Sequence, residues 1–513
     1  MLNRKFRKLT VLLAMMLALL LVACGGAEQI EQAVEQVQEA ATQIAPTVAA
    51  VATEVAEVVE EVTQPEATAE PVEEPMEEEL PYDVSIYGNI DEVGQNLSGV
   101  RVVFWHQHTG AREAQLQIIV DEFNATNPYG IIVEARNEGG YNDIYNKMIA
   151  GLTTGDVPGL TVAYQNQAAA YMVADGLVSL DPYITHPEFG LTAAEQADFF
   201  QAFLDGDRLP QFGNQAFGFP PNRSMEMLYY NAEWLAELRE AGVISFDGPP
   251  VTPEQFAEAV CAAKDNPFSR SADPSFSIGY QVRTDASNFA ALVFARGGDI
   301  FDYDNNRFTL NTPEAKDAMM HIKELFDAGC AVRIAERFGD QSDFGAGKNL
   351  FTMGSSSGFP FYAAAVNEGG TGGFDWSMGA IPYTTPDPVM NIYGASVSVP
   401  QTDPATQLAA WLFIRYYTSP EVQVNWSIQS NYFPVRASVV DELEDYYFEL
   451  NPAYAAAFEL LPFTKREAPV AGYDNVRDVM TQAFERIISG EDIDTVLADA
   501  EAQANRLLEE AAP

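Results

Sequence analysis

From Gly99 onward, short apolar runs alternate with amphipathic stretches, and this alternation limits the possible folds more than any other feature. Residues 100–105 ("VRVVFW") have the composition of a buried strand, and residues 110–128 have the periodicity of a helix that stops at Asn127-Pro128. The pattern repeats with strands at 130–137 and 159–165, each followed by a helix. Strands that alternate with helices at this spacing predict a parallel sheet with crossover helices.

The same alternation returns after Pro220. Residues 225–243 have the pattern of a strand followed by a helix, and residues 348–366 that of a strand, a serine-rich turn and a helix. Apolar and amphipathic segments continue to residue 490 without an internal repeat. The chain is long enough for more than one domain. We therefore expect two α/β lobes, with the chain passing between them more than once.

The N-terminus has the features of an export signal. A basic segment, "MLNRKFRK", precedes an apolar stretch that is too short for an ordinary membrane span and ends in Leu21-Val22-Ala23-Cys24. Small residues directly before a cysteine resemble a bacterial lipobox. Residues 1–23 are therefore predicted to be a lipoprotein signal peptide, with Cys24 acylated and the protein held on the outer face of a membrane. A plain signal peptide with an incidental cysteine is the alternative.

Residues 24–98 are predicted to be an acidic, disordered spacer. Between Cys24 and Arg101 the chain contains no lysine or arginine, and its composition is dominated by Ala, Glu, Gln, Val, Thr and Pro. Such a segment cannot bury enough apolar surface to offset the entropy of ordering it. Repulsion between charges and the prolines make it an extended tether. A partner-binding coiled coil is less consistent, because no heptad pattern is sustained.

Composition also limits the possible partners and cofactors. The formal net charge of −46 argues against nucleic acid, whose phosphates would be repelled. Cys261 and Cys330 are available for a disulfide in an exported protein, but the sequence gives no distance between them, so the pairing stays open. His106 and His108 share one face of a strand end, but a metal site needs further ligands and none follows, so we predict no metal and no cofactor.

Three polar side chains lie just beyond predicted strands. These are His106, Tyr141 and Gln165. In open α/β sheets, ligands bind beyond the carboxyl ends of the strands. The sequence therefore predicts a ligand site at this edge.

Five motifs occur in an order that resembles a known family. They are "FWHQHTG", "EFNATNP", "GGYNDIYNKMIAGLTTGDVPGLTVAYQ", "PPNRSMEMLYYNAEWL" and "GASVSVP…AAWLFIRYYTSPEVQVNW". Together they resemble the extracellular solute-binding proteins (family 1) of ABC importers, and within them the glycerol-3-phosphate-binding and maltose-binding-like group. The resemblance covers roughly residues 100–510. It implies a two-lobed periplasmic-binding-protein fold of type II that closes on ligand at a hinge. Lobe 1 is expected at 99–220 and 395–455, and lobe 2 at 221–394 and 456–513.

The resemblance also implies ligand-binding residues. Tyr141 follows the "GG" pair, Ser224 ends "PPNRS", Ser355 opens "SSSG" and Gly394 lies in "YGAS". Tyr432 in "NYFPV" and Arg477 in "GYDNVRDVM" complete the pattern, and Arg477 could grip a phosphate or carboxylate with a bidentate fork. Trp105 is an aromatic face for a sugar ring, and His106 is a candidate rim residue.

Two departures from the family pattern leave the identity of the ligand open. The family has a glutamate where this chain has Gln165, and a tryptophan-rich loop is missing near "GYQVRTDASNF". Both positions bear on how ligand hydroxyls are held.

The function that these features favour is capture of a sugar, an oligosaccharide or a glycerol-3-phosphate-like solute for a membrane permease. We expect a monomer without enzymatic activity. A sensor lipoprotein with the same fold is an alternative. A secreted esterase or glycosidase is another, although "GASVS" and "SSSGF" both miss the esterase pattern G-x-S-x-G.

Overall fold

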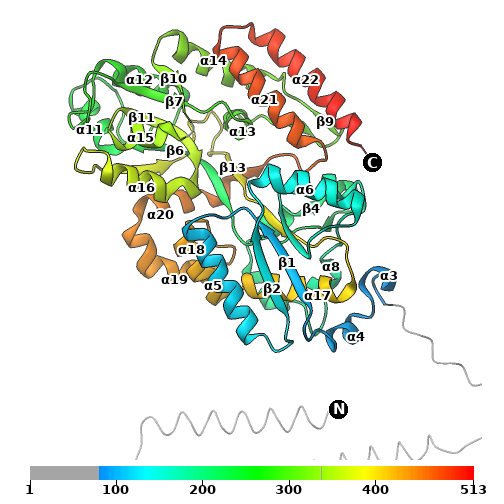
Figure 1. Cartoon of the computed structure of the whole chain (residues 1–513). Helices are drawn as coiled ribbons and strands as arrows, with labels where there is room; N and C mark the ends of the chain where they lie inside the picture. The colour runs from blue at the N-terminus through cyan, green and yellow to red at the C-terminus, as the bar shows by residue number, and fades with distance from the viewer. Residues whose placement is uncertain (1–79, 337, 513) are drawn as a thin grey trace, which may run out of the picture. The chain divides into compact units, whose positions relative to one another are not determined.

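The computed structural model describes residues 80–336 and 338–512. The predicted signal peptide and the acylated Cys24 lie outside these residues. Buried apolar side chains form two clusters, one built from residues 87–219 and 395–435 and the other mainly from residues 225–390 and 433–508. We call the bodies around them lobe 1 and lobe 2, which are the lower and upper bodies in Figure 1. Among the described residues, no helix combines the length and apolar character needed to cross a bilayer.

Lobe 1 is built on a four-stranded sheet in the order β14-β3-β1-β2. Strand β1 pairs in parallel with β2 and β3, while β14 pairs antiparallel with β3. The strands are β1 (Arg101–His106), β2 (Ile132–Asn137), β3 (Leu160–Ala163) and β14 (Ser396–Ser398). The predicted parallel arrangement is confirmed for the first three strands. The antiparallel edge strand is β14, which belongs to the segment in which the chain returns to lobe 1.

Helices cover this sheet where the periodicity predicted them. The longest ends at Asn127, whose side chain accepts from Ile131 N and donates to Phe123 O, so the chain turns before Pro128. The helices of lobe 1 are α5 (Ala111–Thr126), α6 (Tyr141–Thr154), α7 (Gln165–Met172), α8 (Asp181–Ile184), α9 (Ala193–Asp198), α10 (Gln201–Asp205), α17 (Pro404–Tyr417) and α18 (Pro420–Ser430). A small hairpin joins β4 (Arg208–Leu209) to β5 (Gln215–Ala216) through the 3-10 turn η1 (Pro210–Phe212).

Lobe 2 contains a mixed sheet in the order β10-β7-β11-β6-β13-β15, with β12 also paired to β6. Its central strand β6 is buried along its whole length. The strands are β6 (Ser224–Asn231), β7 (Ile278–Val282), β10 (Ala331–Arg333), β11 (Asn349–Ser355), β12 (Trp376–Gly379), β13 (Met390–Tyr393) and β15 (Thr464–Arg466). A separate hairpin joins β8 (Phe301–Asp302) to β9 (Arg307–Phe308).

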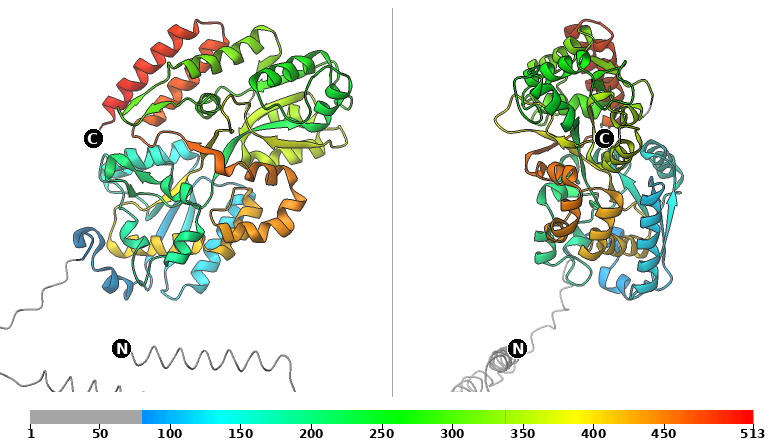
Figure 2. Two further views of the ribbon diagram at one scale, coloured as in Figure 1. Left: turned by 180° about the vertical axis from the view of Figure 1, so that it is seen from behind. Right: turned by 90° about the vertical axis from the view of Figure 1, so that its left-hand side faces the viewer.

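The helices of lobe 2 come from three parts of the chain. The red C-terminal pair α21 and α22 packs together on this lobe in both views of Figure 2. The helices are α11 (Ala232–Glu240), α12 (Pro253–Asp265), α13 (Ala286–Phe294), α14 (Pro313–Asp327), α15 (Gly339–Gly345), η2 (Ser356–Gly358), α16 (Phe359–Glu368), α19 (Ala437–Leu443), η3 (Glu444–Phe448), α20 (Pro452–Phe458), η4 (Leu461–Phe463), α21 (Tyr473–Ile488) and α22 (Ile493–Glu510).

The folded body begins before Gly99. Helices α3 (Val84–Tyr87) and α4 (Ile90–Gly94) pack against α17 of lobe 1. Ile90 is fully buried, and Tyr87 Oη donates to the carbonyl oxygen of Ser179 at 3.0 Å. The prediction that the disordered spacer reaches residue 98 is therefore wrong for this segment. Three apolar side chains of this segment (Tyr87, Ile90 and Leu97) are buried in the core of lobe 1, and composition averaged over a long window hides so few residues.

The chain passes between the lobes at three places. Phe219 bridges Val397, and Tyr393 pairs with Ser224, so the first two crossings lie side by side. At the third, Arg223 bridges Phe433. After it, α19 and α20 pack with the core of lobe 2, although residues up to 455 were predicted to belong to lobe 1. The predicted lobe boundaries remain a proposal.

A buried ion pair holds the first two crossings. Arg223 Nη2 lies 2.9 Å from Asp207 Oδ2, and both side chains are almost fully buried. The same guanidinium donates to the carbonyl oxygens of Phe203 and Gly394, while Ser396 Oγ donates to Asp207 at 2.6 Å. Three segments of the chain therefore meet at one pair of opposite charges: residues 203–207, Arg223 and residues 394–396.

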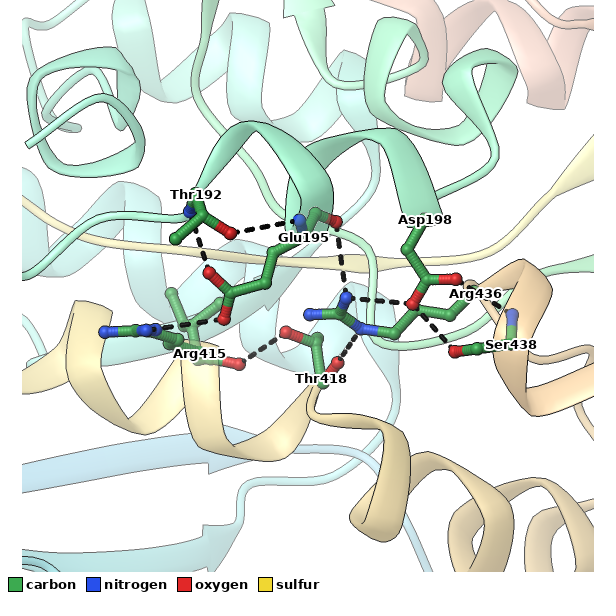
Figure 3. A network of polar contacts seen from close by, with 8 residues as sticks. Thr192, Glu195, Asp198, Arg415, Thr418, Arg436 and Ser438 are labelled. Carbon is green, nitrogen blue, oxygen red and sulfur yellow. Dashed lines mark hydrogen bonds and ion pairs between the residues drawn. The ribbon is translucent and has the colours of Figure 1, made fainter. Parts of the chain in front are cut away.

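A second buried arginine fixes the third crossing (Figure 3). Arg436 donates to the backbone carbonyls of Thr418 and Glu195 and to Asp198 Oδ2, the last at 3.2 Å. Asp198 also accepts from the backbone N–H of Ser438 at 2.8 Å. The chain therefore leaves lobe 1 at a fixed point next to α9.

Cys261 and Cys330 form a disulfide that closes a stretch of 69 residues within lobe 2. The sequence left this pairing open. Cys261 lies on α12, and Cys330 directly precedes β10. The bond ties the helix to the edge of the sheet.

We expect Asp207→Asn to lower the free energy of unfolding by about 3–5 kcal/mol, because Arg223 would stay buried without its counter-ion. Urea unfolding followed by tryptophan fluorescence at neutral pH measures this. The matched control is Asp247→Asn, which removes the partner of the exposed Arg239 and should cost at most about 0.5 kcal/mol. Equal midpoints for the two variants would contradict a special role for the buried pair.

Replacing both Cys261 and Cys330 by serine should lower the free energy of unfolding by about 2–4 kcal/mol, because the unfolded chain gains loop entropy. Urea unfolding with and without dithiothreitol measures this. Dithiothreitol should shift the wild-type midpoint and leave that of the double variant unchanged. An unshifted wild-type midpoint, with both thiols free in peptide maps made without reductant, would contradict the pairing.

Candidate functional site

A cavity of about 340 Å³ lies between the two lobes. Lobe 1 lines it with the first residues of α6 and α7. Lobe 2 lines it with β6, the segment after β7, the ends of β11 and β13, Glu467, and the first turns of α21. We call it the cleft cavity. Its walls come from both sides of the crossing segments, so movement of one lobe against the other changes its size.

The cleft cavity brings together four of the residues predicted from the sequence. Tyr141, Gln165, Ser355 and Arg477 all line it. Tyr141 and Gln165 are the first residues of α6 and α7 and lie just beyond strands of lobe 1, as predicted for ligand contacts in an open sheet. Ser355 ends β11, and Arg477 lies on α21.

Ser224 and Gly394 lie on the first two crossings. Both belong to the hinge strands, where Tyr393 pairs with Ser224 and the Gly394 carbonyl accepts from Arg223 at 3.3 Å. Gly394 has a φ of 151°, and an added Cβ would lie only 3.1 Å from the backbone of Asn222. Neither residue lines the cleft cavity.

Trp105, predicted as an aromatic face for a sugar ring, and His106, predicted at the rim, line neither this cavity nor the one described below. His106 is only 2% exposed and packs against the rings of Phe104 and His108. The ammonium of Lys147 lies over the Trp105 ring. Alternation along β1 buries His106 on one face of the sheet and leaves Trp105 half-buried on the other.

His106 is therefore a packing residue of the strand end, whereas His108, which is also buried, lines the second cavity described below. Burial lowers the pKa of His106 to about 4 and that of His108 to about 3. Both rings are neutral at pH 7. Gln107 Nε2 lies 3.3 Å from His108 Nδ1 and donates to Tyr141 Oη at 3.0 Å, which links this strand end to the cleft.

Tyr432 lies in a neighbouring cavity of about 400 Å³, which shares Tyr141 with the first. We call it the side cavity. Arg112 of α5 lines it and crosses to lobe 2, where its Nη2 donates to the carbonyl oxygen of Ser357 at 2.7 Å. The same guanidinium lies 4.6 Å from the Tyr432 ring centre and 5.8 Å from that of Phe361. Arg112 thus joins the lobes at the edge of the cleft.

The charge of Arg477 is balanced within the protein. Its guanidinium pairs with the buried Glu467 and donates to Ser287 Oγ at 3.0 Å. Glu467 also accepts from Ser287, Asn391 and Tyr473 at 2.6–2.9 Å. Burial alone would raise the pKa of Glu467, but Arg477 and these hydrogen bonds hold it below its usual range. Any anion bound by Arg477 must compete with this carboxylate.

Glu226 has the opposite environment. It is 3% exposed, and its Oε2 accepts from Tyr393 Oη at 2.6 Å. Its Oε1 has no hydrogen-bond partner in the described part of the chain. Burial and the nearby Asp285 raise the pKa of Glu226 to about 8. The cleft cavity therefore holds a carboxyl group that is largely protonated at pH 7 and has one oxygen unused.

The sequence interpretation did not identify several lining residues: Tyr164, Glu226, Arg283, Asp285, Ser287, Tyr393, Glu467 and Tyr473. One signal was present. A glutamate in the apolar run "SMEMLYYN" is unusual for a fully buried strand, which points to a functional role. Glu467 carries no comparable signal, because its position depends on how the last crossing folds back.

Comparisons with known proteins agree with this architecture. Residues 119–456 match the profile of the bacterial extracellular solute-binding proteins. The sn-glycerol-3-phosphate-binding periplasmic proteins UgpB of Shigella dysenteriae and Escherichia coli are each 24% identical over 404 residues, which is 76% of this chain and 88% of theirs.

Solved structures show the same fold. UgpB from Mycobacterium tuberculosis in complex with glycerophosphocholine has a TM-score of 0.66 at 22% identity, over 80% of this chain and 99% of that one. The cyclic alpha-maltosyl-1,6-maltose binding protein from Arthrobacter globiformis has a TM-score of 0.64 at 21% identity, over 80% and 99%. The predicted two-lobed α/β fold of type II is confirmed.

The predicted family is confirmed as well, since the matched profile covers most of the chain. Its proteins act outside the cytoplasm, in agreement with the extracytoplasmic address expected from the N-terminus. The chain is a member of the bacterial extracellular solute-binding proteins.

Proposed function

We propose that the chain is the solute-binding component of an ABC importer. It captures a small polar solute (a sugar, an oligosaccharide or a glycerol-3-phosphate-like compound) and presents it to the membrane subunits of a permease. The observation that carries this proposal is the cleft cavity, whose polar walls come from both lobes. The UgpB proteins and the maltose-binding proteins of the same fold support the choice of solutes.

Tyr141, Gln165, Ser355 and Arg477 are the ligand contacts in this proposal, because they line the cleft cavity together. Tyr432 acts from the side cavity, where it stacks with Arg112. Ser224 and Gly394 act through the hinge strands. Trp105 and His106 are left out, since neither lines the cleft cavity or the side cavity.

Closure of the lobes on the solute is the proposed mechanism. Ligand shifts the population toward the closed form by contacting both walls at once. Contacts between α7 and α21, together with Arg112 on Ser357, already join the lobes across the cleft. The permease then recognises the closed form. No covalent step is involved, and the protein acts as a monomer held at the membrane through Cys24.

Thermal unfolding with a panel of sugars, oligosaccharides and glycerol-3-phosphate tests this proposal. A solute at about 100 times its Kd should stabilise the protein by about 2.7 kcal/mol. We expect Gln165→Ala to reduce the rise in melting temperature that the solute causes, because Gln165 lines the cavity. Arg477→Ala should reduce it too, but that variant also leaves Glu467 unpaired.

The matched control for the arginine is Arg486→Ala. Arg486 lies on the same helix, where it pairs with Glu491 and Asp499 at the surface. Arg486→Ala should show the same rise in melting temperature with the solute as the wild type. Absence of a shift with every solute of the panel would refute the proposed function, and equal shifts in wild type and Gln165→Ala would refute the proposed site.

A further inference from the structure

The charges around the cleft cavity do not balance. Four carboxyl groups line it, on Glu226, Asp285, Glu467 and Asp474, against two guanidinium groups, on Arg283 and Arg477. Both guanidinium groups already have partners. Arg477 pairs with Glu467, and Arg283 Nη2 lies 2.9 Å from Oδ2 of Asp340, which is fully buried behind the cavity wall.

Three carboxyl groups remain without a cation. Within residues 80–336 and 338–512, no ion pair involves Glu226, Asp285 or Asp474. Burial raises the pKa of both Glu226 and Asp474, as expected for acids with no counter-charge. A negatively charged group on a ligand would be repelled by these carboxyl groups. Water would screen this repulsion poorly, because the cavity is partly desolvated.

One of these carboxyl groups, that of Glu226, lacks a hydrogen-bond partner on one of its oxygens within the residues that the structure describes. Glu226 is 3% exposed, and its Oε1 is enclosed without a hydrogen bond although it belongs to a residue that lines the cavity. Buried polar atoms in folded proteins nearly always have a partner. Its other oxygen is held by Tyr393, so the carboxyl group is fixed in place while one oxygen is left for a ligand.

The tyrosine rings of the wall suit a positive charge as well. Tyr141 and Tyr164 meet edge to face with their centres 4.9 Å apart, and Tyr393 and Tyr473 also line the cavity. Aromatic faces attract ammonium groups, and their attraction increases when the cation is desolvated.

We propose that the solute taken by the cleft cavity is a polyhydroxylated compound that carries a positively charged nitrogen, and that Glu226 is the residue that selects for this nitrogen. The proposal rests on the proposed function and narrows its solute class. An amino sugar and a zwitterionic glycerophosphodiester share this chemistry. A simple phosphate monoester, with two negative charges and no cation, does not.

The proposal predicts a proton-linked affinity. The charged and titratable groups that face Glu226 are Tyr229 on its own strand, Tyr280, Arg283 and Asp285 from β7 and the segment after it, Tyr393 from β13, and Glu467. Burial and Asp285 raise the pKa of Glu226 to about 8 in the free protein, and a bound cation favours its ionised form, so binding should release a proton at pH 7. For a solute whose positive nitrogen does not titrate, such as glycerophosphocholine, affinity should therefore rise as the pH increases from about 6 to about 8, by at most about tenfold per unit, and level off above.

Matched pairs of solutes test the selection by charge. Isothermal titration of the full chain compares glucosamine with glucose, and glycerophosphocholine with glycerophosphoglycerol, which has a hydroxyl group in place of the quaternary nitrogen. We expect the nitrogen-bearing member of at least one pair to bind at least tenfold more tightly. Glu226→Gln keeps the shape of the side chain and should remove most of that advantage.

Glu368→Gln is the control, because Glu368 is an exposed carboxylate on α16 of the same lobe. It should leave the advantage unchanged. For glycerophosphocholine, whose nitrogen does not titrate, titrations in two buffers of different ionisation enthalpy count the protons released. Wild type should release a proton at pH 7 and Glu226→Gln should not.

The possible outcomes separate this inference from the proposed function. Neutral members that bind as tightly as their partners, or an advantage that survives in Glu226→Gln, would overturn the inference and leave the solute-binding role intact. The same holds if only solutes without a positive nitrogen bind. If no solute of either panel binds, the proposed function fails and the inference fails with it.

Discussion

The ion pair between Arg223 and Asp207 is the point on which the two-lobed arrangement depends. It lies at the first two crossings, and it also binds the segment around Phe203 and the strand that contains Ser396. Two buried charges are stable there because each has its counter-ion and further hydrogen bonds. The ion pair therefore holds the register of the hinge strands at the junction of the two lobes.

Charge pairing also determines what the cleft can hold. Arg477 would be read from the sequence as a free anion-binding group, but in the structure Glu467 neutralises it. The side chains that remain without a counter-charge are acidic, and the most enclosed of them is Glu226.

Much of the fold could be predicted because it is local. The alternation at 100–176 predicted three parallel strands and their helices, and the motif order predicted the family. The contacts of Glu467 could not be predicted, since its donors come from α13, β13 and α21. The segment "GYQVRTDASNF", where the family's tryptophan-rich loop is missing, supplies Arg283, Asp285 and Ser287 to the cleft. The sequence pattern drew attention to this segment, but it could not show which of its side chains line the cleft cavity.

The docking of α3 and α4 onto α17 has a mechanical consequence. Both short helices belong to lobe 1, and the bond from Tyr87 to Ser179 and the burial of Ile90 hold them there. A pull on the N-terminal end of the folded body is taken up by these contacts before it reaches any of the three crossings. Tension on that end therefore acts on lobe 1 and not on the crossing strands.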